Sequence, residues 1–303
     1  MSSKFPLEAW AEHRPWLTRF AYFLIGVMMT LSFAPFGYYL LAPILLLPLL
    51  YAFLRLAPAV AARLGASFGA GLFLAGTYWL YVSIHVFGQA PLILALALML
   101  GLVIIMSLYY AATGWMLAHC RGLNLWQFII LAPAIWVFNE WLRGWVLSGF
   151  PWMTLGYSQV DSTLSAMAPV LGVYGVSLAL LVSASALLVG VLSTGSTRIA
   201  CLSVAIVPWL AGIVLDGHDW TNPSGPTVRT TIVQGGVSQD RKWLPEQFET
   251  TLDLYRDSLL SNDQSELVVW PEVAIPSVAD RVEGYIKQLE LDLQHNRQTL
   301  LFG

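Results

Sequence analysis

Long apolar runs fill the first 216 residues of this chain and limit what it can fold into. A helix needs about 20 mostly apolar residues to cross ~30 Å of hydrocarbon. Only 11% of the residues are charged, whereas an ordinary soluble domain has about 25%. These features predict a multi-pass helical membrane bundle with seven spans, over residues 18–34, 38–56, 61–83, 89–118, 125–147, 165–193 and 199–215.

The positively charged residues alternate between the loops of this predicted bundle. Lys and Arg are absent from the predicted loops 35–37, 84–88 and 148–164. They occur before or between the other spans, at Lys4, Arg14, Arg19, Arg55, Arg63, Arg121 and Arg198. Because cytoplasmic loops carry an excess of Lys and Arg, the pattern predicts a cytoplasmic N-terminus. Seven crossings then place residues 217–303 on the opposite side of the membrane.

Two ionisable residues, Glu140 and Arg143, lie inside the predicted span 125–147. They are three residues apart, share a helix face and are able to pair. A charged residue inside a membrane suggests a functional site by default, but we favour the alternative, an internal ion pair near the outer interface that fixes helix packing. The loop 148–164, SGFPWMTLGYSQVDSTL, also has two interpretations. It is either an aromatic belt at the headgroup level or a lipid-facing surface with a function.

Other residue types in the first 216 residues favour structural interpretations. Glycines of the third predicted span allow helices to approach closely; they are Gly65, Gly69, Gly71 and Gly76. The two cysteines, Cys120 and Cys201, lie in or near apolar stretches without metal-ligand spacing. The net charge of −3 provides no general basic field for nucleic acid. The sequence therefore predicts neither a metal site nor a nucleic-acid partner.

The remaining residues predict a linker and the start of a soluble α/β domain. Residues 217–226 are polar and contain Pro and Gly turn signals. The domain, residues 227–303, is predicted to contain strands over 228–233, 267–270 and 299–302 and helices over 245–260 and 279–296. This alternation is typical of a parallel sheet. Two helices leave the edges and faces of such a sheet uncovered, so we expect the domain to be incomplete.

Glu272 is the residue of this domain with the clearest chemical interest. It follows the predicted strand 267–270, at the end of a parallel sheet where α/β proteins bind ligands. We expect Trp270, Pro271 and Ile275 to remove part of its solvent, which raises the pKa of a carboxyl group and suits it to general-base work. The alternative is an ordinary solvated glutamate in a turn.

Several motifs resemble the apolipoprotein N-acyltransferase family, whose soluble part belongs to the nitrilase-like (CN hydrolase) superfamily. The resemblance covers nearly the whole chain. WPE alone would indicate only the superfamily, but the motifs together are specific. They are FAPFG at 33–37, WLYVSIHVFG at 79–88, EWLRGWVLSGFPW at 140–152, LGYSQ at 155–159, VQGGVSQDRKW at 233–243 and VVWPEVAIP at 268–276.

The resemblance implies an activity in the bacterial inner membrane, with the soluble domain in the periplasm. Such an enzyme transfers an acyl chain from a membrane phospholipid to the amino group of the diacylglyceryl-cysteine at a lipoprotein N-terminus. The reaction passes through a thioester on a cysteine and uses a Glu-Lys-Cys triad. The resemblance implies that Glu272 is the general base and that Trp243 belongs to the substrate-binding rim. It implies no metal and no diffusible cofactor.

The family's lysine and cysteine lie farther downstream than this chain extends. Lys287, Cys120 and Cys201 do not match them, so we expect these 303 residues alone to be inactive and to be the N-terminal part of an enzyme or a truncated product. Two alternatives stay open. One is another membrane-tethered nitrilase-like amidase or acyltransferase. The other is a non-catalytic membrane fragment that binds lipid or protein.

Overall fold

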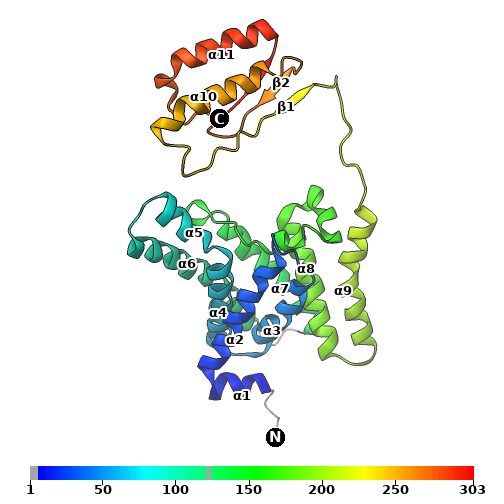
Figure 1. Ribbon diagram of the computed structural model, residues 1–303. Helices are drawn as coiled ribbons and strands as arrows, with labels where there is room; N and C mark the ends of the chain where they lie inside the picture. Colours follow the sequence, from blue (N-terminus) through cyan, green and yellow to red (C-terminus); the bar gives the residue numbers. More distant parts are fainter. Residues whose placement is uncertain (1–5, 121–123) are drawn as a thin grey trace. The chain divides into compact units, whose positions relative to one another are not determined.

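The computed structural model describes residues 6–120 and 124–303, which form two compact units (Figure 1). The first unit is Met1–Trp220 and the second is Thr221–Gly303. Lys4 and Arg121, two of the residues that predict the orientation, lie outside the described residues. The first unit is helical, and the second is a small three-stranded sheet with helices.

The apolar runs of the first unit form helices. Their bounds are α1 Pro6–His13, α2 Pro15–Met29, α3 Leu41–Arg55, α4 Pro58–Gly76, α5 Trp79–Tyr81, α6 Leu92–His119, α7 Leu125–Arg143, α8 Ala168–Leu192 and α9 Gly195–Leu215. Among the described residues, five helical segments are long and apolar enough to cross a membrane: α4, α6, α7, α8 with the preceding turn, and α9. The α3 helix is also apolar but shorter, with 15 residues. The protein is therefore a multi-pass membrane protein.

Two of these helices end earlier than the apolar runs predict. The third predicted span reaches residue 83, but α4 ends at Gly76 and the chain continues through α5 into a π-helix, Val82–Phe87. At the end of α4, the Thr77 hydroxyl donates a hydrogen bond to the Phe73 carbonyl over 2.6 Å. The α7 helix ends at Arg143 instead of residue 147. Apolar residues continue past both helix ends, at Leu80 and Val82 and at Val146 and Leu147, so composition alone does not locate the ends.

Glycines of α4 bring it close to its neighbours, as predicted. A Cβ atom added at Gly65 would lie 2.2 Å from the Tyr110 carbonyl oxygen of α6. At Gly71 it would lie 2.0 Å from the Phe23 carbonyl oxygen of α2. Both distances are shorter than any van der Waals contact, so the backbones could not approach this closely with a larger residue. The packing role of these glycines is confirmed.

The second unit is a parallel sheet with a helix after each of its first two strands. Its elements are β1 Thr230–Ile232, α10 Pro245–Leu260, β2 Leu267–Val269, α11 Glu283–Asn296 and β3 Thr299–Leu301. The strands pair in parallel in the order β1-β2-β3, with Thr231 opposite Val268 and Val268 opposite Leu300. The predicted parallel sheet and the predicted order of its elements are confirmed.

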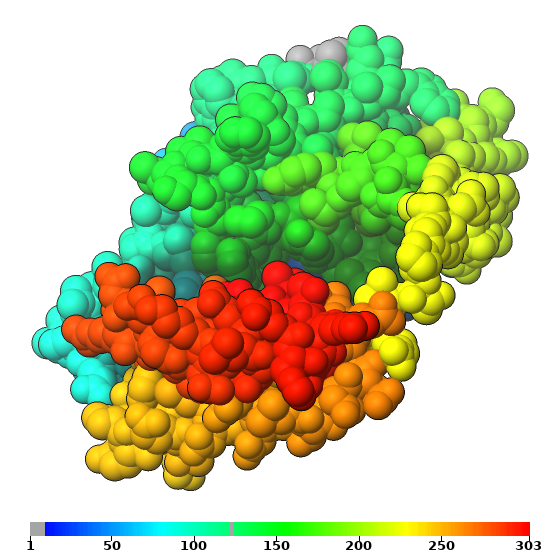
Figure 2. Space-filling view, turned by 90° about the horizontal axis from the view of Figure 1, so that it is seen from above, coloured from blue at the N-terminus to red at the C-terminus, as the bar shows by residue number. Residues whose placement is uncertain are grey.

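The two helices of the second unit pack against one small core and against each other. The core contains Leu252, Tyr255 and Leu259 of α10 together with Val268, Trp270 and Leu289. Figure 2 shows α11 and the C-terminal strand (orange to red) beside the yellow-orange atoms of α10.

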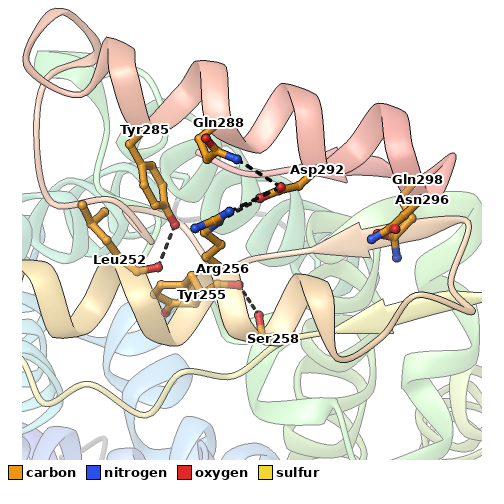
Figure 3. A network of polar contacts seen from close by, with 9 residues as sticks. All are labelled: Leu252, Tyr255, Arg256, Ser258, Tyr285, Gln288, Asp292, Asn296 and Gln298. Carbon is orange, nitrogen blue, oxygen red and sulfur yellow. Dashed lines mark hydrogen bonds and ion pairs between the residues drawn. The ribbon is translucent and has the colours of Figure 1, made fainter.

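Polar contacts join α10 to α11 above this core (Figure 3). Arg256 Nε donates to Asp292 Oδ2 over 2.8 Å, and the Tyr285 hydroxyl donates to the Leu252 carbonyl over 2.7 Å. Burial raises the pKa of Tyr285 to about 12, so this hydroxyl keeps its proton across the physiological range. The α10–α11 contact therefore combines an apolar centre with a polar rim.

Candidate functional site

The carboxyl end of β2 positions the segment that contains Glu272. The Trp270 amide donates to the Leu301 carbonyl, and the Val273 amide donates to the Gly303 carbonyl, each over 2.9 Å. Val273 has a φ of +55°, so the backbone turns sharply just after Glu272. The Glu272 backbone is thus held between hydrogen-bonded neighbours at the end of the sheet where α/β proteins bind ligands.

The expected partial burial of Glu272 is wrong for this structure, because its side chain is exposed. Trp270 and Ile275 lie in the core, with exposures of 3% and 7%, and do not cover the carboxylate. The Trp270 ring packs against Tyr255 and Phe302, with centroid distances of 5.2 and 5.8 Å. The error has a simple cause: β2 ends at Val269, so Glu272 lies in the turn after the strand, and that turn directs its side chain to solvent.

Trp243 lies in the loop that precedes α10 and is 60% exposed. It lines an open cleft of about 290 Å³ whose walls also include Lys242, Phe248 and Arg281. The Lys242 ammonium donates to the Glu272 carbonyl over 3.4 Å. The loop after β1 and the loop after β2 therefore meet, although Glu272 itself does not line the cleft.

A larger pocket, of about 680 Å³, lies within the first unit. Its lining is mostly aromatic and apolar, and it comes from three connections between helices. These residues are Phe33, Ala34, Pro35 and Phe36 after α2, Tyr78 and Trp79 after α4, and Pro151, Trp152, Met153, Tyr157 and Val160 between α7 and α8. Three motifs that are far apart in the sequence, FAPFG, WLYVSIHVFG and the segment around GFPW, therefore build one cavity.

Arg143 and Glu140 are both buried next to this pocket, with exposures of 1% and 4%. Arg143 donates from Nη1 to the Trp152 carbonyl over 2.8 Å and from Nη2 to the Thr154 hydroxyl over 3.1 Å. Glu140 Oε1 accepts from the Leu155 amide over 2.8 Å. None of the ion pairs within 4 Å in the described part of the chain joins Glu140 to Arg143. The pairing that their spacing allows is thus replaced by bonds to the loop.

Sequence reasoning identified Glu140, Arg143 and the loop 148–164 separately but not their contacts or the pocket. Trp136 was also missed, and its indole N–H donates to Glu140 Oε1 over 3.1 Å. The available signal was the four-residue spacing of Trp136 and Glu140, which puts both on one helix face. The contacts from Arg143 to the loop had no such signal, because nothing in the sequence states how an irregular loop folds back.

The other reactive side chains lie away from both regions. Cys201 is buried in α9, and Cys120 follows α6. The Lys287 ammonium is exposed on α11 and is bonded to Glu283 over 2.7 Å. Within residues 6–120 and 124–303, no cluster of three His, Cys, Asp or Glu side chains is arranged to hold a metal ion.

Comparison with known proteins gives one consistent family. The profile described as the apolipoprotein N-acyltransferase N-terminal domain matches residues 25–186. Apolipoprotein N-acyltransferase of Methylococcus capsulatus is 38% identical over 92% of this chain and 56% of its own length. Those of Pseudomonas syringae and Pseudomonas paraeruginosa are 36% and 38% identical, over 92% and 97% of this chain and 56% and 58% of their own lengths.

The chain thus spans a little more than half the length of the curated relatives it matches. The residues matched by the profile include those that line the aromatic pocket, together with Glu140 and Arg143. The matches to the whole relatives extend through most of the second unit as well. On this evidence the chain belongs to the apolipoprotein N-acyltransferase family.

Proposed function

We propose that this protein carries out, as part of a complete enzyme, the N-acylation of bacterial lipoproteins. The acyl donor is a membrane phospholipid, and the acceptor is the α-amino group of a diacylglyceryl-cysteine at a lipoprotein N-terminus. The observation that carries this proposal is the 38% identity to apolipoprotein N-acyltransferases along 97% of the chain. A transmembrane unit with an aromatic pocket also suits two substrates that both reside in a membrane.

The proposed topology has seven spans in the bacterial inner membrane, with a cytoplasmic N-terminus. It adds α2 and α3 to the five longer helices. Each has 15 residues, which is short for a span, but α2 continues in a 3₁₀ turn through Ser32. A short span is tolerated through local thinning of the bilayer. The charge pattern of the loops supports this orientation, which places the second unit in the periplasm.

We also propose that the second unit is the first part of a nitrilase-like domain and that Glu272 is its general base. A carboxylate in this role takes the thiol proton and returns it to the departing lysophospholipid alcohol as the thioester forms. It then takes a proton from the attacking acceptor amine and returns it to the departing thiolate as the amide forms. Trp243 contributes to the rim that receives the substrates. We assign the nucleophile and the oxyanion-stabilising lysine to no residue of this chain.

The aromatic pocket is the proposed binding site for the acyl chain of the donor. Its lining includes six aromatic rings, which are Phe33, Phe36, Tyr78, Trp79, Trp152 and Tyr157. Burial of an acyl chain against such a lining is favourable at roughly 25 cal/mol per Å² of apolar surface. Entry from the bilayer would avoid transfer of the lipid into water. This assignment favours the functional interpretation of the loop 148–164 over a simple aromatic belt.

The proposal is tested on the protein at native length, in its source membrane lipids, with a diacylglyceryl-cysteine peptide as acceptor. Mass spectrometry measures the gain of one amide-linked acyl chain. We expect Glu272→Gln to lower the rate between about 10²- and 10⁴-fold, the range typical of general-base catalysis. The matched control is Glu283→Gln, which changes an exposed glutamate of the same unit.

Two results would contradict the proposal. If the native-length protein transfers no acyl chain to the peptide, the assigned reaction is wrong. If it does and Glu272→Gln retains the wild-type rate, the reaction stands but another group is the base. Glu283→Gln must keep its activity for the comparison to hold.

A further inference from the structure

We propose that Glu140 and Arg143 are positioning residues that hold the segment 150–157 as a preformed wall of the aromatic pocket. The inference rests on the proposed function in one respect, that an acyl chain occupies this pocket. It assigns to the two intramembrane charges a role in shaping a lipid site, in place of an ion pair between them that fixes helix packing.

Arg143 supplies the first half of this support. Its guanidinium bonds the Trp152 carbonyl and the Thr154 hydroxyl, and its Cζ lies 5.1 Å from the centre of the Phe73 ring. Its own carbonyl accepts the Phe150 amide over 2.8 Å. A planar guanidinium with donors in fixed directions holds two acceptors at a set separation. Both ends of the short stretch from Phe150 to Thr154 are therefore tied to Arg143.

Glu140 supplies the second half, one turn earlier on α7. Its Oε1 atom accepts the Leu155 amide, and the Trp136 indole N–H fixes the orientation of the carboxyl group. The next residue along, Gly156, donates its amide to the Ser177 hydroxyl of α8 over 2.7 Å. The first two amides of the 3₁₀ turn Leu155–Gln159 are thus bonded by side chains of α7 and α8, as burial requires.

The backbone of this connection is in an unfavourable conformation that needs such support. Leu147, Ser148 and Met153 have φ values of +55°, +72° and +58°, in the left-handed region that residues other than glycine rarely adopt. Conformations of this kind persist only where the surroundings determine them, and they cluster at ligand sites. The bonds from Glu140 and Arg143 lie within two residues of Met153.

The supported segment supplies part of the pocket lining, including Trp152 and Met153. Trp152 stacks on Phe150 with a centroid distance of 4.8 Å and lies 6.0 Å from the Trp79 ring on the opposite connection. The Met153 side chain contacts the position of Gly76, where an added Cβ would lie 2.7 Å from its Sδ atom. Release of the Trp152 carbonyl would therefore let both side chains move and change the shape of the pocket.

The experiment measures which residues of the protein are in contact with the acyl chain of a lipid. The 303-residue chain is placed in phosphatidylglycerol nanodiscs that contain a phospholipid with a diazirine near the end of one acyl chain. After illumination, mass spectrometry gives the yield of adducts in the pocket peptides around Trp152 and Trp79. The yield at Ile93, a lipid-exposed residue of α6 (83% exposed), serves as the internal reference.

We expect Arg143→Gln to lower the ratio of pocket adducts to Ile93 adducts about tenfold or more, because a buried hydrogen bond to a charged group is lost. Arg143→Lys keeps the charge but loses the two-pronged geometry, so an intermediate ratio is expected. The matched control is Asn139→Leu, which removes a buried polar group of the same helix. The Asn139 amide donates to the Ile135 carbonyl of α7 and to the Met116 sulfur of α6.

The outcomes separate this inference from a general effect on folding and from the proposed function. Hydrogen exchange of the loop amides from Phe150 to Gly156 should rise in Arg143→Gln, while the α4 and α6 amides stay protected. A wild-type ratio in Arg143→Gln, or an equal loss in Asn139→Leu, overturns the inference. Absence of pocket adducts in the wild-type chain overturns it too. Because no turnover is measured, failure of the acyl-transfer assay leaves these results unaffected.

Discussion

Arg143 of the first unit, which spans the membrane, and Arg256 of the second unit both bind oxygen atoms, but they differ in exposure and in the charge of their partners. Arg143 is 1% exposed, and its partners are a carbonyl and a hydroxyl. The Arg256 side chain is 35% exposed, and its partner is the carboxylate of Asp292. A buried guanidinium without its partners is costly, whereas a pair near water contributes little. The membrane unit therefore depends on polar contacts for the shape of its connections, and the second unit depends on its apolar core.

The largest effect that tests this comparison is expected in the core of the second unit. Leu259 is fully buried against Val268 and Trp270 in the same cluster. Leu259→Ala should cost about 2–5 kcal/mol of the stability of this unit, the usual range for a buried leucine. Protease susceptibility of residues 221–303 and hydrogen exchange at β2 would measure the loss. Leu254→Ala, on the exposed side of α10 (41% exposed), is the control and should be nearly neutral.

The membrane unit should be most sensitive where its helix backbones meet. Gly65→Ala would place a Cβ 2.2 Å from the Tyr110 carbonyl oxygen, so α4 and α6 must separate. We expect a loss of about 1–3 kcal/mol, as for other overpacked sites, in denaturant titrations of the chain in detergent. Gly101→Ala on α6 is the matched control, since an added Cβ meets nothing within 4 Å there. Equal stability of the two variants would show that backbone contact does not limit this bundle.

The comparison also explains which parts of the fold the sequence predicts well. The bounds of α10 agree with the prediction because Phe248, Leu252, Tyr255 and Leu259 mark one face at helical spacing. The end of α4 was predicted seven residues too late, because the apolar run continues past Gly76 into the connection that contains α5 and the π-helix. A periodic pattern of apolar residues predicts a regular helix or strand. The pocket is built mainly from the connections between helices, whose apolar residues follow no such pattern.

The same reasoning applies to the candidate sites. Glu272 was found from its place after a strand, which is a local feature, but its exposure is set by the turn at Val273, whose amide bonds the Gly303 carbonyl. Glu140 and Arg143 were found from their charge, but each also bonds a backbone group far along the chain, 15 and 9 residues later. Backbone N–H and C=O groups are the same in nearly every residue, so no pattern of residue types could have predicted those bonds.

A smaller effect is expected at the partly buried ion pair between Arg256 and Asp292. The hydrogen bond from Arg256 holds the pKa of Asp292 below its usual value of 3.8. Because the folded pKa is lower than the unfolded one, the stabilisation is complete above about pH 4 and is lost as pH falls through the folded value. Asp292→Asn should cost at most about 1 kcal/mol at pH 7 and should remove this acid dependence from the stability of the second unit. If Asp292→Asn lowers the stability of the second unit as much as Leu259→Ala does, the second unit does not depend mainly on its apolar core.

The smallest effect is expected at Lys287, the lysine nearest in the chain to the proposed general base. Its ammonium bonds Glu283 one turn away on α11, and both side chains are about two-thirds exposed, at 67% and 70%. Such a pair on a helix surface contributes about 0.3–0.5 kcal/mol, so Lys287→Ala should change the unfolding midpoint of the second unit only slightly. In the native-length protein it should leave acyl transfer unchanged, because the proposed mechanism assigns this lysine no role. A loss of transfer near that of Glu272→Gln would place Lys287 in the active site and contradict its assignment to a solvent-exposed helix face.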